Sequence, residues 1–139
     1  MRYQSPSIKL VLDKYKNNGF EELIILHLFP QYASATTGSV IEKVKEEMKD
    51  WEVIPSLKFI SKFPSDPGFI KAFGELGKKH MEKDDYDHVL FSFHGLPERQ
   101  IFKSSTNNYC KLGNRFDHYH TKNAFCYRAQ CFESARKIA

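Results

Sequence analysis

The sequence has little that would direct it into or across a membrane. Its amino-terminal residues, Met1 to Pro6, form no apolar signal segment, and no stretch approaches the roughly 18 apolar residues of a spanning helix. Its three cysteines are odd in number and all lie in the last thirty residues, so they do not resemble the paired framework of a secreted domain. We therefore expect a cytoplasmic protein without a transmembrane segment and leave peripheral membrane contact open.

The sequence also lacks a concentrated positive charge. Its 21 lysines and arginines exceed its 17 acidic residues by enough for a formal charge of +4, but the lysines are spread over helix-like segments without a run of five. This excludes a dedicated nucleic-acid surface and leaves anionic small molecules or lipid headgroups as partners. The 139 residues, 41% of them hydrophobic, are enough for one folded domain with a core.

The hydrophobic pattern alternates between helical and extended segments. Near-continuous apolar runs such as Leu23–Phe29 are typical of strands covered on both faces, as in a parallel sheet. The sequence therefore predicts an α/β fold with right-handed crossovers. No complete strand precedes the first helix, so we expect the chain to begin in mid-domain with an open apolar sheet edge. The expected helices span residues 8–15, 40–48 and 67–81, and the expected strands 23–29, 56–61 and 88–93.

A histidine follows the last of these expected strands. Val89 to Phe93 form the apolar run, and Gly95 and Pro97 stop it, which places His94 at the carboxyl end of the strand. Open parallel sheets bind their ligands at that end. A histidine there can bind a metal or exchange protons near neutral pH. A histidine that only caps the strand or bonds to a neighbouring loop is the alternative.

A second polar segment follows the first expected strand. Residues Gln31–Ser39 are rich in hydroxyl groups and lead into the helix that contains Val40 and Val44. Hydroxyl side chains before a helix often cap its free N–H groups, and this role accounts for one or two of them. The surplus favours a polar loop that faces a ligand.

The last third of the chain is less regular. Lys103 to Asn114 form a polar loop of unusual length, and such loops tend to be functional or mobile. A final helix is predicted from about Asn123 to Ile138. Cys126 and Cys131 would lie about 140° apart around an ideal helix, so the two thiols cannot both point at one ion without local unwinding.

Several separated motifs together resemble the bacterial ferrochelatase family, and the resemblance extends over essentially the whole chain. Phe29-Pro30-Gln31-Tyr32, with Ser34 and Thr36 to Ser39, resembles one signature stretch, and Ser92 to Pro97 resembles another. Arg2-Tyr3 followed by Pro6 is similar to a third. The segment Cys126 to Cys131 resembles the cysteine-bearing segment of one bacterial branch of the family.

The resemblance implies an enzyme that inserts ferrous iron into a porphyrin in haem biosynthesis. It also implies two similar Rossmann-like halves with the active cleft between them. His94 falls on the family's histidine, which accepts pyrrole protons or binds the incoming iron as substrate. The remaining implied substrate-binding residues are Arg2 and Tyr3 along the cleft and Tyr32, Ser34 and Thr36 on the porphyrin-side loop.

The length of the chain departs from the family, whose members normally run to more than twice 139 residues. We therefore expect an incomplete half of a two-domain fold, and we expect the chain alone to be inactive. Residues 1–100 would form a partial N-terminal chelatase half-domain and residues 101–122 a long polar loop. Residues 123–139 would form a helix leading toward a second half-domain. The oligomeric state stays open.

Two other functions stay open at this point. One is a short cobalt or nickel chelatase that acts as a dimer of single half-domains, which would explain the length. The other is a non-enzymatic metal-binding or iron–sulfur module, although the cysteine spacing is neither a zinc-finger nor a ferredoxin pattern. The cysteine-bearing branch has additional cysteines where this chain has residues 115–120. A [2Fe–2S] cofactor would use Cys110, Cys126 and Cys131 with a fourth ligand from Asp117, His118 or His120, unless these cysteines are simply buried thiols.

Overall fold

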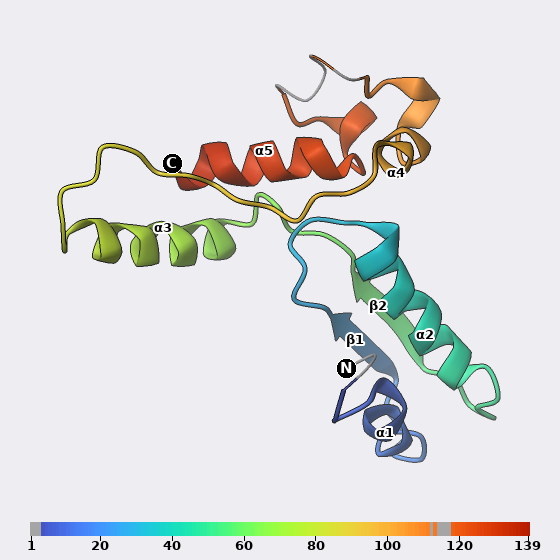
Figure 1. The fold of residues 1–139 in the computed structure, drawn as a ribbon. Helices are drawn as coiled ribbons and strands as arrows, with labels where there is room; N and C mark the ends of the chain where they lie inside the picture. The colour runs from blue at the N-terminus through green and yellow to red at the C-terminus, as the bar shows by residue number, and fades with distance from the viewer. Residues whose placement is uncertain (1–3, 112, 114–117) are drawn as a thin grey trace. The chain divides into compact units, whose positions relative to one another are not determined.

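The computed structural model describes residues 4–111, 113 and 118–139, without the side chain of Asn108. It divides into two compact units, one ending at Lys62 and one running from Phe63 to Ala139. The division falls inside the segment 1–100 that the sequence assigned to one half-domain, and that assignment stays a prediction. Figure 1 shows the helices and strands of both units.

The first unit contains a two-stranded parallel sheet, which confirms the α/β class. Strands β1 (Glu22–Leu26) and β2 (Ser56–Ile60) pair in register, with Glu22 opposite Ser56 and Leu26 opposite Ile60. Parallel neighbours need a crossover connection, and a helix supplies it here as the alternating pattern predicted. The other elements of the unit are α1 (Ile8–Asp13), a π-helical turn (Ser34–Gly38) and α2 (Ser39–Met48).

The core of the first unit lies between its helices and one face of the sheet. Leu12 from α1 and Met48 from α2 are buried together with Trp51, and Leu23 and Ile25 of β1 pack against them. The alternate residues Ile24 and Leu26 of β1 are 59% and 57% exposed, and Leu28, which follows the strand, is 84% exposed. The expectation of a strand covered on both faces is therefore wrong for β1, because residues 4–62 place helices against one face only.

The second unit is built around two helices that pack together, α3 (Pro67–Met81) and α5 (Tyr127–Ile138), which lie side by side in Figure 1. Asp66 caps α3 by accepting the Phe69 N–H at 2.9 Å, and Pro67 occupies the first turn, so the helix has the predicted bounds of residues 67–81. The buried hydroxyl of Ser134 on α5 donates to the carbonyl of Pro64 at 2.8 Å. This bond joins α5 to the segment that leads into α3.

The segment expected to be a long polar loop is partly helical. It contains the end of α4 (Glu98–Lys103) and the 3₁₀ turns Thr106–Asn108 and Thr121–Asn123. Ile101 of α4 is buried in a cluster with Cys110, Cys126 and Ala129, and this burial holds the segment against the start of α5. The last helix begins four residues later than predicted, because Cys126 has extended backbone angles and precedes the first helical residue.

The third predicted strand is absent from the described residues. Residues 88–93 have no strand assignment, and Val89 and Leu90 are 55% and 92% exposed. A strand exists by pairing with a neighbour, and residues 63–111 and 118–139 supply none. His94 therefore follows an unpaired extended segment in this structure, and its predicted position at the end of a strand is wrong here.

None of the helices in the described part of the chain is both long and apolar enough to cross a membrane.

Candidate functional site

The loop that the sequence singled out begins directly after β1 and closes into a π-helical turn. The carbonyl of Ala33 accepts the N–H of Gly38 at 3.1 Å and also that of Thr36 at 3.2 Å. The first of these bonds spans five residues, which is the π-helical spacing, and such turns are frequent at functional sites. The turn continues into α2, so the loop is anchored at both ends by regular structure.

The hydroxyl groups of this loop divide into two kinds. Thr36 donates its hydroxyl hydrogen to the carbonyl of Ala33 at 3.3 Å, and Ser39 donates to the carbonyl of Thr36 at 2.9 Å. Both bonds go to backbone carbonyls and not to free N–H groups, so neither hydroxyl is the helix cap that the sequence led us to expect. Thr37 is fully buried, and its hydroxyl has no partner among the described residues. Ser34 is exposed and is therefore the serine or threonine of the turn best placed to meet a ligand.

Tyr32 lies close to the same turn. Its hydroxyl oxygen would lie 3.5 Å from a Cβ atom added at Gly38, and the Cβ of Ser34 would lie 3.6 Å from that atom. The half-buried Tyr32 ring therefore folds back over the turn that carries Ser34. Of the predicted porphyrin-side residues, the structure brings Tyr32, Ser34 and Thr36 together.

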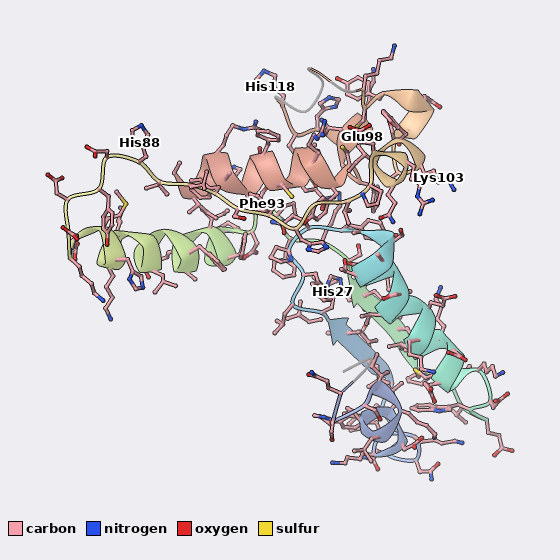
Figure 2. All side chains as sticks on the ribbon, viewed as in Figure 1. His27, His88, Phe93, Glu98, Lys103 and His118 are labelled. Atoms are coloured by element: carbon pink, nitrogen blue, oxygen red, sulfur yellow. The ribbon has the colours of Figure 1, made fainter. Side chains whose placement is uncertain are left out.

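A residue that the sequence analysis did not single out precedes this loop. His27 follows β1 directly, as Figure 2 shows, and only 6% of it is exposed. The sequence signal for this residue is that His27 lies inside an otherwise apolar run. A histidine buried in such a run must find hydrogen-bond partners or remain neutral.

His94 lies in the second unit on the extended segment that precedes α4. Its side chain is exposed and makes no hydrogen bond to a described residue. The neighbouring residues Phe93 and Glu98, labelled in Figure 2, mark this segment and the start of α4. The histidine is thus accessible to a ligand without being held by a protein partner. His88 lies on the same segment and is also exposed, which makes it a natural control.

Two of the predicted site residues, Arg2 and Tyr3, lie outside the described residues, as does the candidate ligand Asp117.

The three cysteines are free and buried in the second unit. Cys110 and Cys126 belong to one apolar cluster, and their thiols interact directly. Burial raises the pKa of Cys126 to about 11, and the neighbouring Cys110 thiol adds to the shift. Burial likewise raises the pKa of Cys131 to about 11, although a hydrogen bond with Tyr127 opposes it. Both thiols are therefore protonated at neutral pH, and a metal ion that bound them would have to displace their protons.

The histidines beside these cysteines do not complete a ligand set. His118 is exposed (Figure 2), while His120 bonds through Nε2 to the Tyr109 hydroxyl at 2.9 Å and accepts the Lys122 N–H through Nδ1 at 3.2 Å. In the described part of the chain, no three His, Cys, Asp or Glu residues are grouped to hold a metal ion. The described residues as arranged here form no ligand set for an iron–sulfur cluster, and the candidate ligand Asp117 lies outside them.

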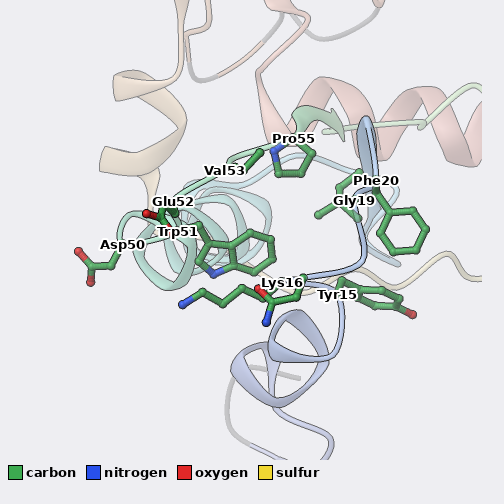
Figure 3. A pocket seen from close by; sticks show the side chains of 11 residues that line it. Tyr15, Lys16, Gly19, Phe20, Asp50, Trp51, Glu52, Val53 and Pro55 are labelled. Carbon is green, nitrogen blue, oxygen red and sulfur yellow. The ribbon is translucent and has the colours of Figure 1, made fainter.

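A cleft of about 660 Å³ lies elsewhere in the first unit (Figure 3). The segments after α1 and α2 line it, and these segments lead into the amino ends of β1 and β2. The Tyr32–Thr36 loop follows the carboxyl end of β1, so the cleft is separate from the candidate site. Its walls include Tyr15, Phe20 and Trp51, and its charged residues are of both signs.

The structure thus contains a parallel α/β unit with a hydroxyl-rich turn after β1 and, in its second unit, an exposed histidine. The sequence model of the Ferrochelatase family matches residues 1–139, and the chain belongs to that family. A protein named Ferrochelatase from Legionella pneumophila (strain Corby) is 43% identical over 139 residues, covering all of this chain and 40% of that protein. One from Coxiella burnetii (strain RSA 493 / Nine Mile phase I) is 39% identical over 142 residues, covering all of this chain and 38% of that protein.

The chain therefore spans about two fifths of the length of these curated relatives. No solved structure matched it. The family match does not favour the short cobalt or nickel chelatase or the non-enzymatic metal-binding module.

Proposed function

We propose that this chain provides part of the active site of an enzyme that inserts ferrous iron into a porphyrin. The observation that carries the proposal is the turn after β1, where Tyr32 and Ser34 lie together beside an anchored π-helical segment in a chain of the ferrochelatase family. An aromatic ring beside an exposed hydroxyl suits a flat macrocycle that carries polar side groups.

The reaction requires two protons to leave the macrocycle. Two pyrrole N–H bonds break and bonds from the nitrogens to Fe²⁺ form, so that one porphyrin and one ferrous ion give the metallated ring and two protons. His94 is the proposed proton acceptor, because histidine exchanges protons near neutral pH and this side chain is accessible. Here Fe²⁺ is the substrate, and the protein's part is to bind the ring and remove the protons.

The proposal also covers the reaction class, the cellular location and the cofactor. We place the reaction, formation of metal–nitrogen bonds by a lyase, in the cytoplasm, which cell fractionation would test. A [2Fe–2S] centre on Cys110, Cys126 and Cys131 would require these thiols to rearrange and ionise, and iron and sulfide analysis of anaerobically purified protein would test it.

Porphyrin titration tests the binding part of the proposal. Protoporphyrin and coproporphyrin are titrated into the chain, and quenching of Trp51 fluorescence is followed. Tyr32→Ala should weaken binding by about tenfold, because loss of a stacking aromatic costs about 1–3 kcal/mol by analogy with base stacking. Tyr86→Ala is the control, since Tyr86 is a 53% exposed tyrosine in the second unit. Equal affinities for the two variants would contradict a porphyrin site at the turn.

A further inference from the structure

His27 makes a short-range hydrogen bond where β1 ends and the candidate loop begins. Its Nδ1 accepts the backbone N–H of Phe29 at 3.3 Å, and the two rings lie 5.8 Å apart between centroids with their planes tilted by 32°. A side chain that accepts the N–H two residues ahead closes a turn, as asparagine and aspartate do in Asx turns. The bond therefore fixes the direction in which the chain leaves β1.

The bond specifies the protonation state of the ring. A nitrogen that accepts a hydrogen bond cannot carry a proton, so in the neutral imidazole the proton is on Nε2. Nε2 is buried and makes no hydrogen bond of ordinary geometry to the described residues, although the backbone of Ser61 lies near enough to interact with the ring. Burial lowers the pKa of His27, and the nearby backbone of Ser61 opposes this more weakly. The neutral ring is thus the form that suits the folded chain.

Among the described residues, the groove around His27 holds no charged side chain that would stabilise an imidazolium. His27 lines this apolar groove of about 340 Å³ formed by α1, β1 and α2, and Tyr15 is the other titratable residue in its described lining. No charge on the described residues contributes to the lowered pKa of His27, which has only burial and the Ser61 backbone as causes. Protonation would both place a charge in this groove and remove the acceptor for the Phe29 N–H.

The segment whose path depends on this bond carries Tyr32, a residue of the candidate site. Between the end of β1 at Leu26 and the start of the π-helical turn at Ser34, the chain has no regular secondary structure. Tyr32 lies in that interval, five residues after His27. A change in the path of the chain at Phe29 would therefore displace the Tyr32 ring relative to the anchored turn.

We propose that His27 is a positioning residue for porphyrin binding, whose neutral imidazole holds the His27–Phe29 turn and so presents Tyr32 and Ser34 to the macrocycle. The inference rests on the proposed function. It adds a residue that touches no substrate and acts through the backbone of Phe29. It also implies that the porphyrin affinity depends on the protonation of a buried group in the first unit.

Two substitutions separate this role from simple filling of space. His27→Asn retains an oxygen that can accept the N–H two residues ahead but does not titrate near neutral pH. His27→Leu is apolar and suits burial, but it removes the acceptor. Porphyrin titrations of the whole chain between pH 5 and 8 compare both variants with the unsubstituted protein. The pH profile of the His27→Asn variant corrects for other titrating groups, including those of the porphyrin.

The proposal predicts three outcomes. The unsubstituted chain should lose affinity as the pH falls below the ordinary histidine value of 6.5, more steeply than His27→Asn. His27→Asn should bind within about twofold of the unsubstituted chain at pH 8. His27→Leu should bind about fivefold more weakly at every pH, which is the fold-change for one net hydrogen bond of about 1 kcal/mol. Equal affinities and pH profiles for the two variants would overturn the positioning role.

A measurement made without porphyrin distinguishes failure of the His27 inference from failure of the proposed function. Nitrogen-15 spectra of the His27 ring should show an unprotonated Nδ1 at pH 8, and the Phe29 amide should exchange faster in His27→Leu. A protonated Nδ1, or unchanged exchange, would overturn the inference whether or not porphyrin binds. Absence of porphyrin binding by the unsubstituted chain at every pH would instead contradict the proposed function.

Discussion

The polar side chains of the proposed site differ in whether they form hydrogen bonds within the chain. Thr36 and Ser39 have their hydroxyl groups bound to backbone carbonyls, whereas Ser34 and His94 are exposed. Groups that act on a substrate need this availability, while groups that shape the loop need the internal bonds. The same loop therefore contains both kinds of residue, and the structure separates them.

The first residue-scale prediction concerns His94. In a chimera in which this chain replaces the matching residues of the Legionella pneumophila relative, His94→Ala should lower the iron-insertion rate by about 10²-fold or more, because the proton acceptor is lost. His88→Ala, on the same exposed segment, should change the rate by less than about twofold. An anaerobic insertion assay measures both. A His94→Ala chimera that keeps more than about a tenth of the rate would show that His94 is not the acceptor.

The second residue-scale prediction concerns the buried thiols. The folded pKa of Cys126 is about 11, above its ordinary value of 9.0, so the folded state retains a proton that the unfolded state loses. The stabilisation is complete below pH 9 and is lost as the pH rises toward 11. Denaturant unfolding at pH 8, 9 and 10 should show the free energy of unfolding falling, and falling less in Cys126→Ala. The cavity cost of that variant is the same at each pH, so parallel curves would refute the shift.

At the scale of elements, the helices follow local signals that the sequence displays. Ser7 and Asp66 both cap helices with their side chains, accepting the N–H of Leu10 at 3.1 Å and of Phe69 at 2.9 Å. The extended segments do not follow local signals alone, because a strand also needs a neighbour. Leu23 to Leu26 pair with β2, whereas Val89 to Phe93 pair with no described residue of the second unit.

The element-scale prediction concerns the start of α3. Asp66→Ala should lower the free energy of unfolding by about 1 kcal/mol, because the Phe69 N–H loses its acceptor. Asp66→Asn is the matched variant, since it keeps an acceptor oxygen and should recover most of the loss. Urea unfolding followed by circular dichroism compares the two. If both variants lost the same stability, the charge of Asp66 and not its capping bond would be responsible.

At the scale of the whole molecule, the described residues include more large apolar side chains that are exposed than are buried in the two cores. Ile24, Leu26 and Leu28 are exposed on and after β1, and Val89 and Leu90 on the unpaired segment. Free strand edges and contiguous apolar surface favour association with other chains. A site assembled from such a chain is also open to water, which weakens every electrostatic interaction that would stabilise the reaction.

The whole-molecule prediction is that the chain alone self-associates and does not metallate a porphyrin at an enzymatic rate. Size-exclusion chromatography should show species larger than a monomer, and Leu26→Lys with Leu28→Lys should reduce them. An anaerobic assay with Fe²⁺ and both porphyrins should show no turnover comparable to that of a full-length relative. A monodisperse monomer with such turnover would contradict the prediction and return the short-chelatase alternative to consideration.

The sequence by itself determined the α/β class, the parallel sheet, the helix over residues 67–81 and the family. These follow from hydrophobic periodicity, capping residues and motifs, which are local properties of the chain. Only the tertiary structure decided that β1 is covered on one face, that residues 88–93 remain unpaired, and that His27 is buried against the Phe29 N–H. The physical reason is that burial and strand pairing depend on which other segments are near in space, and no window of sequence contains that information.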